Sequence, residues 1–466
     1  MTASHPAPSP FEPAFDFARL PATPRPLVPA PAAPECELCV TIPAYNEEAD
    51  IEQTLGALVR QVDLAGRPLD PARYEILVLA NNCTDRTGEI VRAFAARHPA
   101  LNLHLIEIVL RPPHAHVGAA RRLVMDEALR RLEGLGRARG VIAATDGDTR
   151  VRPNWVAANL AEFARGVDAV GGRILSSAEQ IAALSDGTRR YYRLDTAYRT
   201  LRAAYETVLD PNPANPWPRH HHCFGASLAV TAEAYRRAGG LPVVHCLEDM
   251  AFTDALERLG ARIRQSPAVN VLTSLRVSGR VDVGLSWTLS KWTRAAAQGE
   301  PLMLESPDAI AQEMLNARYL RHVWQQGYSR QTVAQAAKKL RVNRRWLNAR
   351  WKATRHVGEL CQAVRWRHRH TRTGPCALPL MEAKAAIVEL RARLLRHRAE
   401  LRRPTFTPAQ TGPAGTFPPV ALSGAGWSFP PLPPETRREP DLRSADSLVP
   451  AASSEPAAGF HLSPVG

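Results

Sequence analysis

The sequence has no apolar run that approaches the roughly 20 residues of a transmembrane helix. Its N-terminus lacks a basic start followed by an apolar stretch, so no signal peptide is predicted and we expect a cytoplasmic protein. The seven cysteines are odd in number and scattered, a pattern typical of reduced thiols rather than of a disulfide framework. Cys36 and Cys39 form a C-x-x-C pair, but no second pair follows at zinc spacing, and Cys39 is predicted to begin a strand.

Acidic residues are scarce in one part of the chain. Residues 317–403 contain 22 Lys and Arg and four acids, a net charge of +18, whereas the whole chain of 466 residues carries +14. The remainder is therefore slightly acidic, at −4, and the basic character belongs to one region. Four regions are predicted: a disordered Pro/Ala-rich N-terminus (1–35), an α/β domain (36–300), a basic α-helical region (301–403) and a disordered Pro-rich tail (404–466).

Strand and helix patterns alternate within the α/β domain. Short apolar runs predict strands, and apolar residues three, four and seven positions apart predict helices. Alternation at this spacing predicts a mostly parallel sheet covered by helices. The predicted strands are 39–42, 75–79, a segment within 101–110, and 141–145, and the predicted helices begin near Ile51 and Thr84 or cover 118–132 and 185–210.

Two aspartates, Asp146 and Asp148, flank Gly147 directly after the apolar run 141–145. In an extended segment residues i and i+2 point to the same side, so both carboxylates are predicted to project from the carboxyl end of a buried strand. Ligands of α/β sheets gather at that edge. Two carboxylates there favour Mg²⁺ or Mn²⁺, and such an ion can carry a diphosphate.

Four motifs follow one another in a defined order. They are Ile42-Pro43-Ala44-Tyr45-Asn46-Glu47-Glu48, Val78-Leu79-Ala80-Asn81-Asn82-Cys83-Thr84-Asp85, Thr145-Asp146-Gly147-Asp148 and Leu247-Glu248-Asp249. This ordered set resembles the family 2 glycosyltransferases of the non-processive bacterial type, over roughly residues 38–290. The resemblance implies the GT-A type nucleotide-diphospho-sugar transferase fold.

The resemblance also implies a role for each matching position. Asp148 would coordinate Mg²⁺ or Mn²⁺, with Asp146 toward the metal or the ribose. Asn81 stands where the family usually has an aspartate, which leaves the base of the nucleotide open. The implied nucleotide-sugar-binding residues are Pro43, Tyr45, Glu47, Asn81, Gly118, Arg121 and Asp146.

The catalytic pair implied by the resemblance is Glu248 and Asp249, with Asp249 as general base. A base must reach the acceptor hydroxyl, and attack opposite the diphosphate inverts the anomeric centre. Arg276 and Arg280 are further candidates for binding the diphosphate, because a guanidinium offers a planar fork to phosphate. A surface basic loop is the alternative for these two arginines.

The basic region contains a pattern that resembles a helix-turn-helix: residues 332–340, a break at 341–343, then Arg344, Arg345 and Arg350 on a second helix. Three interpretations stay open for residues 317–403. They bind nucleic acid, they bind an anionic membrane surface or lipid-linked acceptor, or they form a solvated helical appendage.

The sequence thus predicts a metal-dependent, inverting glycosyltransferase. It would move one sugar from a nucleotide-diphospho-sugar to a hydroxyl on a small or lipid-linked acceptor, in the cytoplasm or at the membrane periphery. One alternative is a retaining enzyme similar to the glucosyl- or mannosyl-3-phosphoglycerate synthases. Another is a nucleic-acid-binding protein whose GT-A domain senses a nucleotide-sugar.

Overall fold

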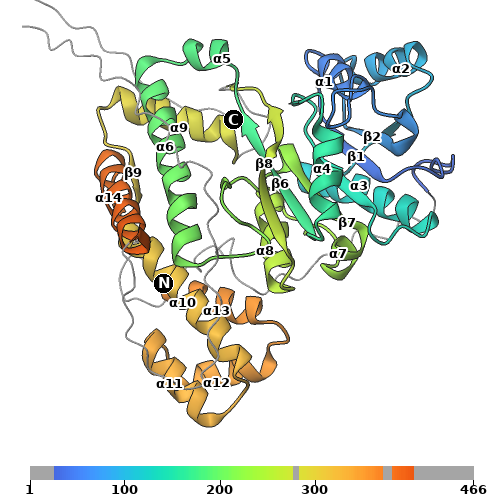
Figure 1. The fold of residues 1–466 in the computed structure, drawn as a ribbon. Coiled ribbons are helices and arrows are strands. Elements are labelled where there is room, and N and C mark those ends of the chain that lie inside the picture. Colours follow the sequence, from blue (N-terminus) through green and yellow to red (C-terminus); the bar gives the residue numbers. More distant parts are fainter. Residues whose placement is uncertain (1–25, 277–282, 371–379, 403–466) are drawn as a thin grey trace, which may run out of the picture. The chain divides into compact units, whose positions relative to one another are not determined.

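The computed structural model describes residues 26–276, 283–370 and 380–402. Its core is an eight-stranded sheet with the strand order β3-β2-β1-β4-β7-β6-β8-β5 (Figure 1). The strands, in chain order, are β1 (Leu38–Ala44), β2 (Tyr74–Asn81), β3 (Leu103–Ile108), β4 (Val141–Ala144), β5 (Arg150–Val151), β6 (Ala169–Leu175), β7 (Leu228–Thr231) and β8 (Ile263–Leu272).

One half of the sheet is parallel and the other is mixed. Strands β3, β2, β1 and β4 run parallel, while β7 is antiparallel to both of its neighbours. The pairing of Ala44 with Ala80 and of Thr41 with Ala144 brings the carboxyl ends of β1, β2 and β4 to one edge. The predicted α/β sheet is confirmed, and this edge is where its loops can form a site.

Two apolar layers hold the sheet between helices. On one side, Val40 and Ile42 of β1 pack in a core with α1 (Ile51–Val59), α2 (Thr87–Arg97) and α4 (Trp155–Ala164). On the other side, Cys39 of β1 belongs to a core with α3 (Val117–Gly134), α7 (Ala232–Arg237) and α8 (Glu248–Arg258). Successive strand residues point to opposite faces, so β1 serves both cores.

The remaining helices follow or flank the sheet. The helices α5 (Ala178–Ala183) and α6 (Asp186–Leu209) lie between β6 and β7 in the chain. After the sheet come α9 (Leu285–Ala297), α10 (Pro307–Gln325), α11 (Arg330–Leu340), α12 (Arg344–Ala353), α13 (Val357–His370) and α14 (Ala383–Arg402). A small antiparallel pair, β9 (Met303–Glu305) and β10 (Leu380–Glu382), and two 3₁₀ turns, Pro71–Arg73 and Gly225–Ser227, complete the elements.

Helices α10 to α13 share a core of their own. It includes Leu320 of α10, Leu340 of α11, Leu347 of α12 and Leu360 of α13. Helix α13 also contacts α8: the Gln362 side-chain amide donates to the Asp254 carbonyl at 2.8 Å. The core of α10–α13 therefore adjoins α8, the helix that begins with Glu248 and Asp249.

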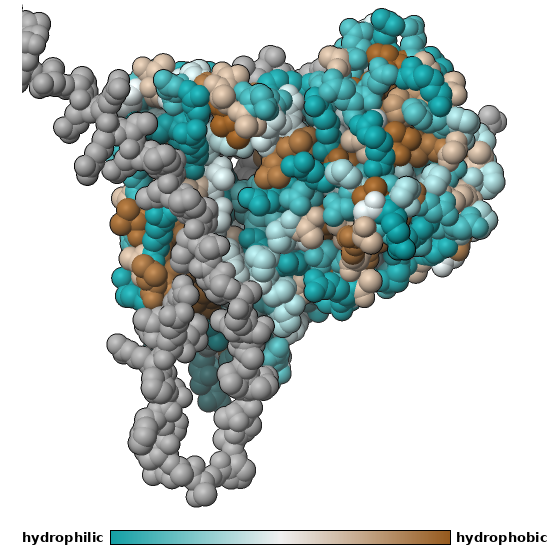
Figure 2. Space-filling view, turned by 45° about the horizontal axis from the view of Figure 1, so that its top comes forward, coloured by the Kyte–Doolittle hydropathy of each residue, from teal (hydrophilic) through white to brown (hydrophobic). Residues whose placement is uncertain are grey.

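No helix in the described part of the chain is long and apolar enough to cross a membrane. The face shown in Figure 2 is mostly hydrophilic, with hydrophobic residues in separate small areas. Residues 26–35, which the sequence assigns to the N-terminal extension, include Val28, buried against α3, where Glu127 accepts its backbone N–H at 3.2 Å.

Candidate active site

The loops after β1 and β2 hold each other in place. The Thr84 backbone N–H donates to the Asn46 side-chain oxygen at 2.8 Å, and the Glu47 N–H donates to the Thr87 hydroxyl at 2.8 Å. Asn46 has a φ of 53°, a left-handed conformation that asparagine tolerates better than most residues. The turn at Pro43–Glu47 leaves Tyr45 exposed and buries the Glu47 side chain.

Glu47 points toward the segment after β4. A Cβ atom at Gly147 would lie 2.8 Å from the Glu47 Cγ, so only glycine fits between the two aspartates. The strand ends at Ala144, and the Thr149 N–H donates to the Asp146 carbonyl at 3.1 Å. Asp146 and Asp148 therefore lie in a turn, and the extended geometry predicted for them is wrong because the strand stops earlier.

Arg276 lies against Asp148 of this turn and against two acids that follow β1. Its guanidinium is 3.0 Å from Asp148, 3.2 Å from Glu47 and 3.9 Å from Asp50. Burial and the nearby Asp146 raise the pKa of Asp148 to about 6, although Arg276 acts in the opposite direction. Three carboxylates thus face one cation, and Arg280, the other predicted arginine, lies outside the described residues.

Arg121 connects the turn to α8. This buried side chain donates to Asp146 at 2.7 Å, to Glu248 at 2.9 Å and to the Gly225 carbonyl at 3.2 Å. Burial alone would lower the pKa of Arg121, but Asp146 and Glu248 raise it above its ordinary value. Three of the four sequence motifs therefore meet around Arg121 or Arg276.

Gly118 allows this connection. A Cβ atom there would lie 2.0 Å from the Val244 carbonyl oxygen, which means that α3 packs closely against the segment before α8. Gly118 and Arg121 are three residues apart on α3 and so lie on the same side of that helix. The close approach brings Arg121 within reach of Glu248.

Asp249 is half-buried beside this ion pair. One of its carboxylate oxygens accepts the Gly225 N–H at 2.8 Å, and the other accepts the Met250 N–H at 2.7 Å. Burial and then Glu248 raise the pKa of Asp249 to about 6. Leu247, just before α8, has a φ of 58°, a strained conformation for a branched side chain and one often found at functional sites.

Asn81 ends β2 at the same edge of the sheet. Its side chain is 6 % exposed, and its carbonyl oxygen has no hydrogen-bond partner among the described residues. A buried polar atom without a partner is costly, unless a ligand or water supplies one. The position fits the nucleoside contact that the sequence predicts.

For the three consecutive histidines 220–222 the sequence favours a polar loop over a role near substrate phosphate, and a retaining enzyme could use them to hold an acidic acceptor. The His222 backbone N–H donates to Nδ1 of His220 at 3.0 Å, so His220 is neutral and its Nε2 donates to the Ser266 carbonyl at 3.1 Å. Burial lowers the pKa of His220 to about 4 and that of His222 to about 3. At neutral pH these side chains carry no positive charge.

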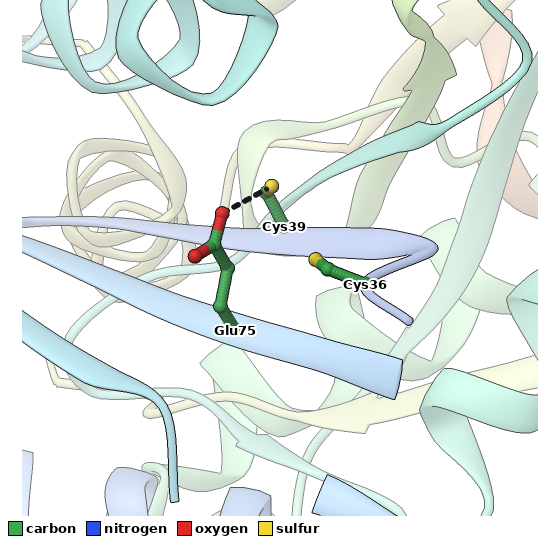
Figure 3. A group of neighbouring side chains, drawn as sticks. All are labelled: Cys36, Cys39 and Glu75. Carbon is green, nitrogen blue, oxygen red and sulfur yellow. Dashed lines mark hydrogen bonds between the residues drawn. The ribbon is translucent and has the colours of Figure 1, made fainter. Parts of the chain in front are cut away.

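A second cluster, Cys36, Cys39 and Glu75, resembles a metal site by proximity (Figure 3). The three possible ligand atoms lie within 4.8 Å of one another. However, Arg131 donates to both Glu75 oxygens, at 2.8 and 2.5 Å, and burial raises the pKa of Cys39. A guanidinium already neutralises the carboxylate and the thiol stays protonated, so the cluster is an internal ion pair.

Residues 39–215 match the model of glycosyl transferase family 2. This part of the chain is a family 2 glycosyltransferase domain. The family predicted from the motifs is thereby confirmed. The match includes Glu47, Asn81, Arg121, Asp146 and Asp148, while Glu248, Asp249 and Arg276 lie beyond its end.

Two curated relatives and one solved structure are similar to this chain. "Probable glycosyltransferase YdaM" of Bacillus subtilis is 26% identical over 50% of this chain and 49% of its own length. "Glycosyltransferase AglE" of Haloferax volcanii is 28% identical over 29% of this chain and 38% of its own. The chain thus spans half or less of these relatives. A mannosyltransferase from Pyrobaculum calidifontis, in complex with GDP-Man and Mn²⁺, aligns at 18% identity over 78% of this chain and 82% of that one, with a TM-score of 0.35.

Proposed function

We propose that the protein transfers a single sugar from a nucleoside-diphosphate-sugar to a hydroxyl acceptor, with inversion at the anomeric carbon. The observation that carries this proposal is the Arg121 bridge. Asp146 and Glu248 are far apart in the chain, yet both bind the same guanidinium. The donor-side acids and the candidate base consequently belong to one site, and the family membership supports sugar transfer as its chemistry.

The donor side would be built by Glu47, Asp146 and Asp148. Their carboxylate oxygens are the hard ligands that Mg²⁺ and Mn²⁺ prefer. Burial, and after it the neighbouring acids, raise the pKa of Asp148 there. A divalent cation at this position would supply charge neutralisation for the departing diphosphate. Asn81 would contact the nucleoside through its unpartnered side-chain oxygen.

The acceptor side would be Asp249. With a pKa of about 6 its carboxylate is ionised at neutral pH and still basic enough to take a proton from a hydroxyl. The N–H groups of Gly225 and Met250 orient it. Glu248 is held by Arg121 and is mostly buried, so we assign it a positioning role rather than contact with substrate.

A retaining enzyme that grips an acidic acceptor is less consistent with these residues. The histidines 220–222 could have supplied positive charge to such an acceptor. His220 is buried and the other two are half-buried, and burial lowers the pKa of all three, so they are neutral at pH 7. A sensor without catalysis would not need a carboxylate of raised pKa beside a helix start, such as Asp249.

The test is release of nucleoside diphosphate from UDP-, GDP-, ADP- and CDP-sugars, with Mn²⁺ or Mg²⁺ and simple sugar alcohols as acceptors. We expect metal-dependent release from one donor. Asp249→Asn should retain affinity for that donor and lose about 100-fold or more of the turnover, the usual contribution of a general base. Asp254→Asn, on the same helix, is the matched control and should retain turnover. Full turnover by Asp249→Asn would exclude it as the base.

A further inference from the structure

The surface of α11 and α12 is unusually rich in unneutralised positive charge. Within the described residues, none of its nine exposed cations lies within ion-pair distance of a carboxylate. The reason is in the sequence, which has no Asp or Glu from 314 to 358. The nine residues are Arg330, Lys338, Lys339, Arg341, Arg344, Arg345, Arg350, Lys352 and Arg355.

Stability of the helices does not explain these charges. Arg344 and Arg345 occupy the first turn of α12, which contains no acid. The positive end of the helix dipole makes cations unfavourable there. Mutual repulsion among the nine cations acts in the same direction, so an external anion would relieve both costs.

The two helices are joined by a short turn. Helix α11 ends at Leu340, Arg341 adopts a left-handed φ of 53°, and the Asn343 side chain caps α12 by accepting the Trp346 N–H at 3.0 Å. The apolar faces are buried in the shared core, through Val333 and Leu340 on α11 and Leu347 on α12. The cations therefore lie on the exposed side of a helix-turn-helix.

We propose that this surface, α11 with α12, binds the phosphate backbone of double-stranded nucleic acid. A helix-turn-helix can place its second helix against a groove while basic side chains contact phosphates. Arg345 and Lys352 are seven residues apart and lie on one side of α12. This binding is additional to sugar transfer and does not depend on it.

An anionic membrane fits the surface less well. A helix that binds in the lipid interface exposes apolar side chains beside its basic ones. Between residues 326 and 356 the single exposed large apolar side chain among the described residues is Tyr328. Its hydroxyl donates to Asn348, and the Lys352 ammonium lies 5.5 Å from its ring centre, so it is already engaged.

The chain's own tail is a weak match for the nine cations. Residues 404–466 contain five acids and three arginines, a net charge of −2. Duplex nucleic acid, in contrast, presents a negative charge about every 1.7 Å along its axis. Charge complementarity therefore favours a polyanion over the tail.

The test is fluorescence anisotropy of the full chain with a labelled DNA duplex of about 20 base pairs, from about 50 to 200 mM NaCl. The logarithm of the affinity should fall linearly with the logarithm of the salt concentration. The double variant Arg345→Gln/Lys352→Gln should lower that slope by about 2, because each substitution removes a cation that would neutralise one phosphate. Circular dichroism and thermal unfolding verify that the variant is folded.

The matched control removes two exposed arginines of the sheet domain, through Arg60→Gln/Arg237→Gln. It changes the net charge equally and should leave the slope unchanged. An equal decrease in both double variants would overturn the proposal, because binding would then follow net charge alone. Binding to phosphatidylserine vesicles without binding to the duplex would also overturn it.

Discussion

Two buried arginines of the sheet domain differ from the exposed cations of α11–α12 in whether a carboxylate neutralises them. Arg121 and Arg131 are 4% and 3% exposed, and each is held by buried carboxylates. Arg345 and Lys352 are exposed, and no described carboxylate is within ion-pair distance. The first kind of charge organises the interior, while the second is available to a partner.

The difference between paired and unpaired cations does not follow the boundary of the basic region, residues 317–403. Helix α13 belongs to that region, yet Arg365 pairs with Glu313 at 2.8 Å and with Glu257 of α8 at 3.6 Å. Arg369 also pairs with Glu313 at 2.8 Å. The net charge of +18 over 317–403 therefore has at least two parts. Arginines of α13 pair with carboxylates, whereas the cations of α11–α12 face outward without a described counter-charge.

The largest predicted contrast concerns stability. Arg131→Met would leave Glu75 buried without its cation, and breaking a fully buried pair costs about 3–5 kcal/mol. Arg345→Met removes an exposed charge and should change the free energy of unfolding by less than about 0.5 kcal/mol. Urea denaturation measures the change in the free energy of unfolding for each variant. Similar losses would mean that the two kinds of arginine do not differ as described.

A second contrast concerns pH. Asp249 must be ionised to act as a base, so kcat/KM should fall as the pH drops below about 6. The Arg121 charge lowers the pKa of Asp249, so Arg121→Gln should shift the fall in kcat/KM to higher pH. Arg121→Lys keeps the charge, so the fall should stay near pH 6.

The control for this contrast is Arg122→Gln. Arg122 is the next residue on α3 but pairs with Asp126 and the Leu241 carbonyl, away from Asp249. Its pH profile should match that of the parent enzyme. If the fall in kcat/KM does not shift in Arg121→Gln, Arg121 does not influence the ionisation of Asp249.

The smallest predicted effect belongs to Arg276, whose side chain is 30% exposed. A part-exposed ion pair is worth about 0.2–1 kcal/mol, so Arg276→Gln should tighten Mn²⁺ binding at pH 8 by up to about five-fold. The reason is that Glu47 and Asp148 would lose a competing cation. Electron paramagnetic resonance of free Mn²⁺ measures this without turnover, and weaker binding would contradict a competing role.

Much of the fold was predictable because it depends on local patterns. The apolar runs at 39–42 and 75–79 became β1 and β2, and the helix predicted for 118–132 became α3. The direction of β7 was not predictable, since Leu228–Thr231 is a short apolar run like those of the parallel strands. Its antiparallel pairing with β4 depends on chain that lies far away in the sequence.

The candidate site likewise contains residues that local motifs identify and contacts that depend on distant parts of the chain. Asp146, Asp148 and Asp249 were identified from local motifs, and they lie around the carboxyl edge of the sheet. The turn that contains Asp146 and Asp148 was missed because their side-chain direction was inferred from an extended strand. The Arg121–Glu248 pair joins residues 127 positions apart, and no local pattern gives such a distance.

The measurement that tests the proposed sugar transfer most directly is a thermal-shift screen of UDP-, GDP-, ADP- and CDP-sugars, with and without Mn²⁺. A ligand that binds the folded state raises the apparent unfolding temperature. We predict a metal-dependent rise with one nucleotide, and its loss in Asp148→Asn. A folded protein that shows no rise with any of them, or an equal rise in Asp148→Asn, would contradict a metal-dependent donor site at this edge of the sheet.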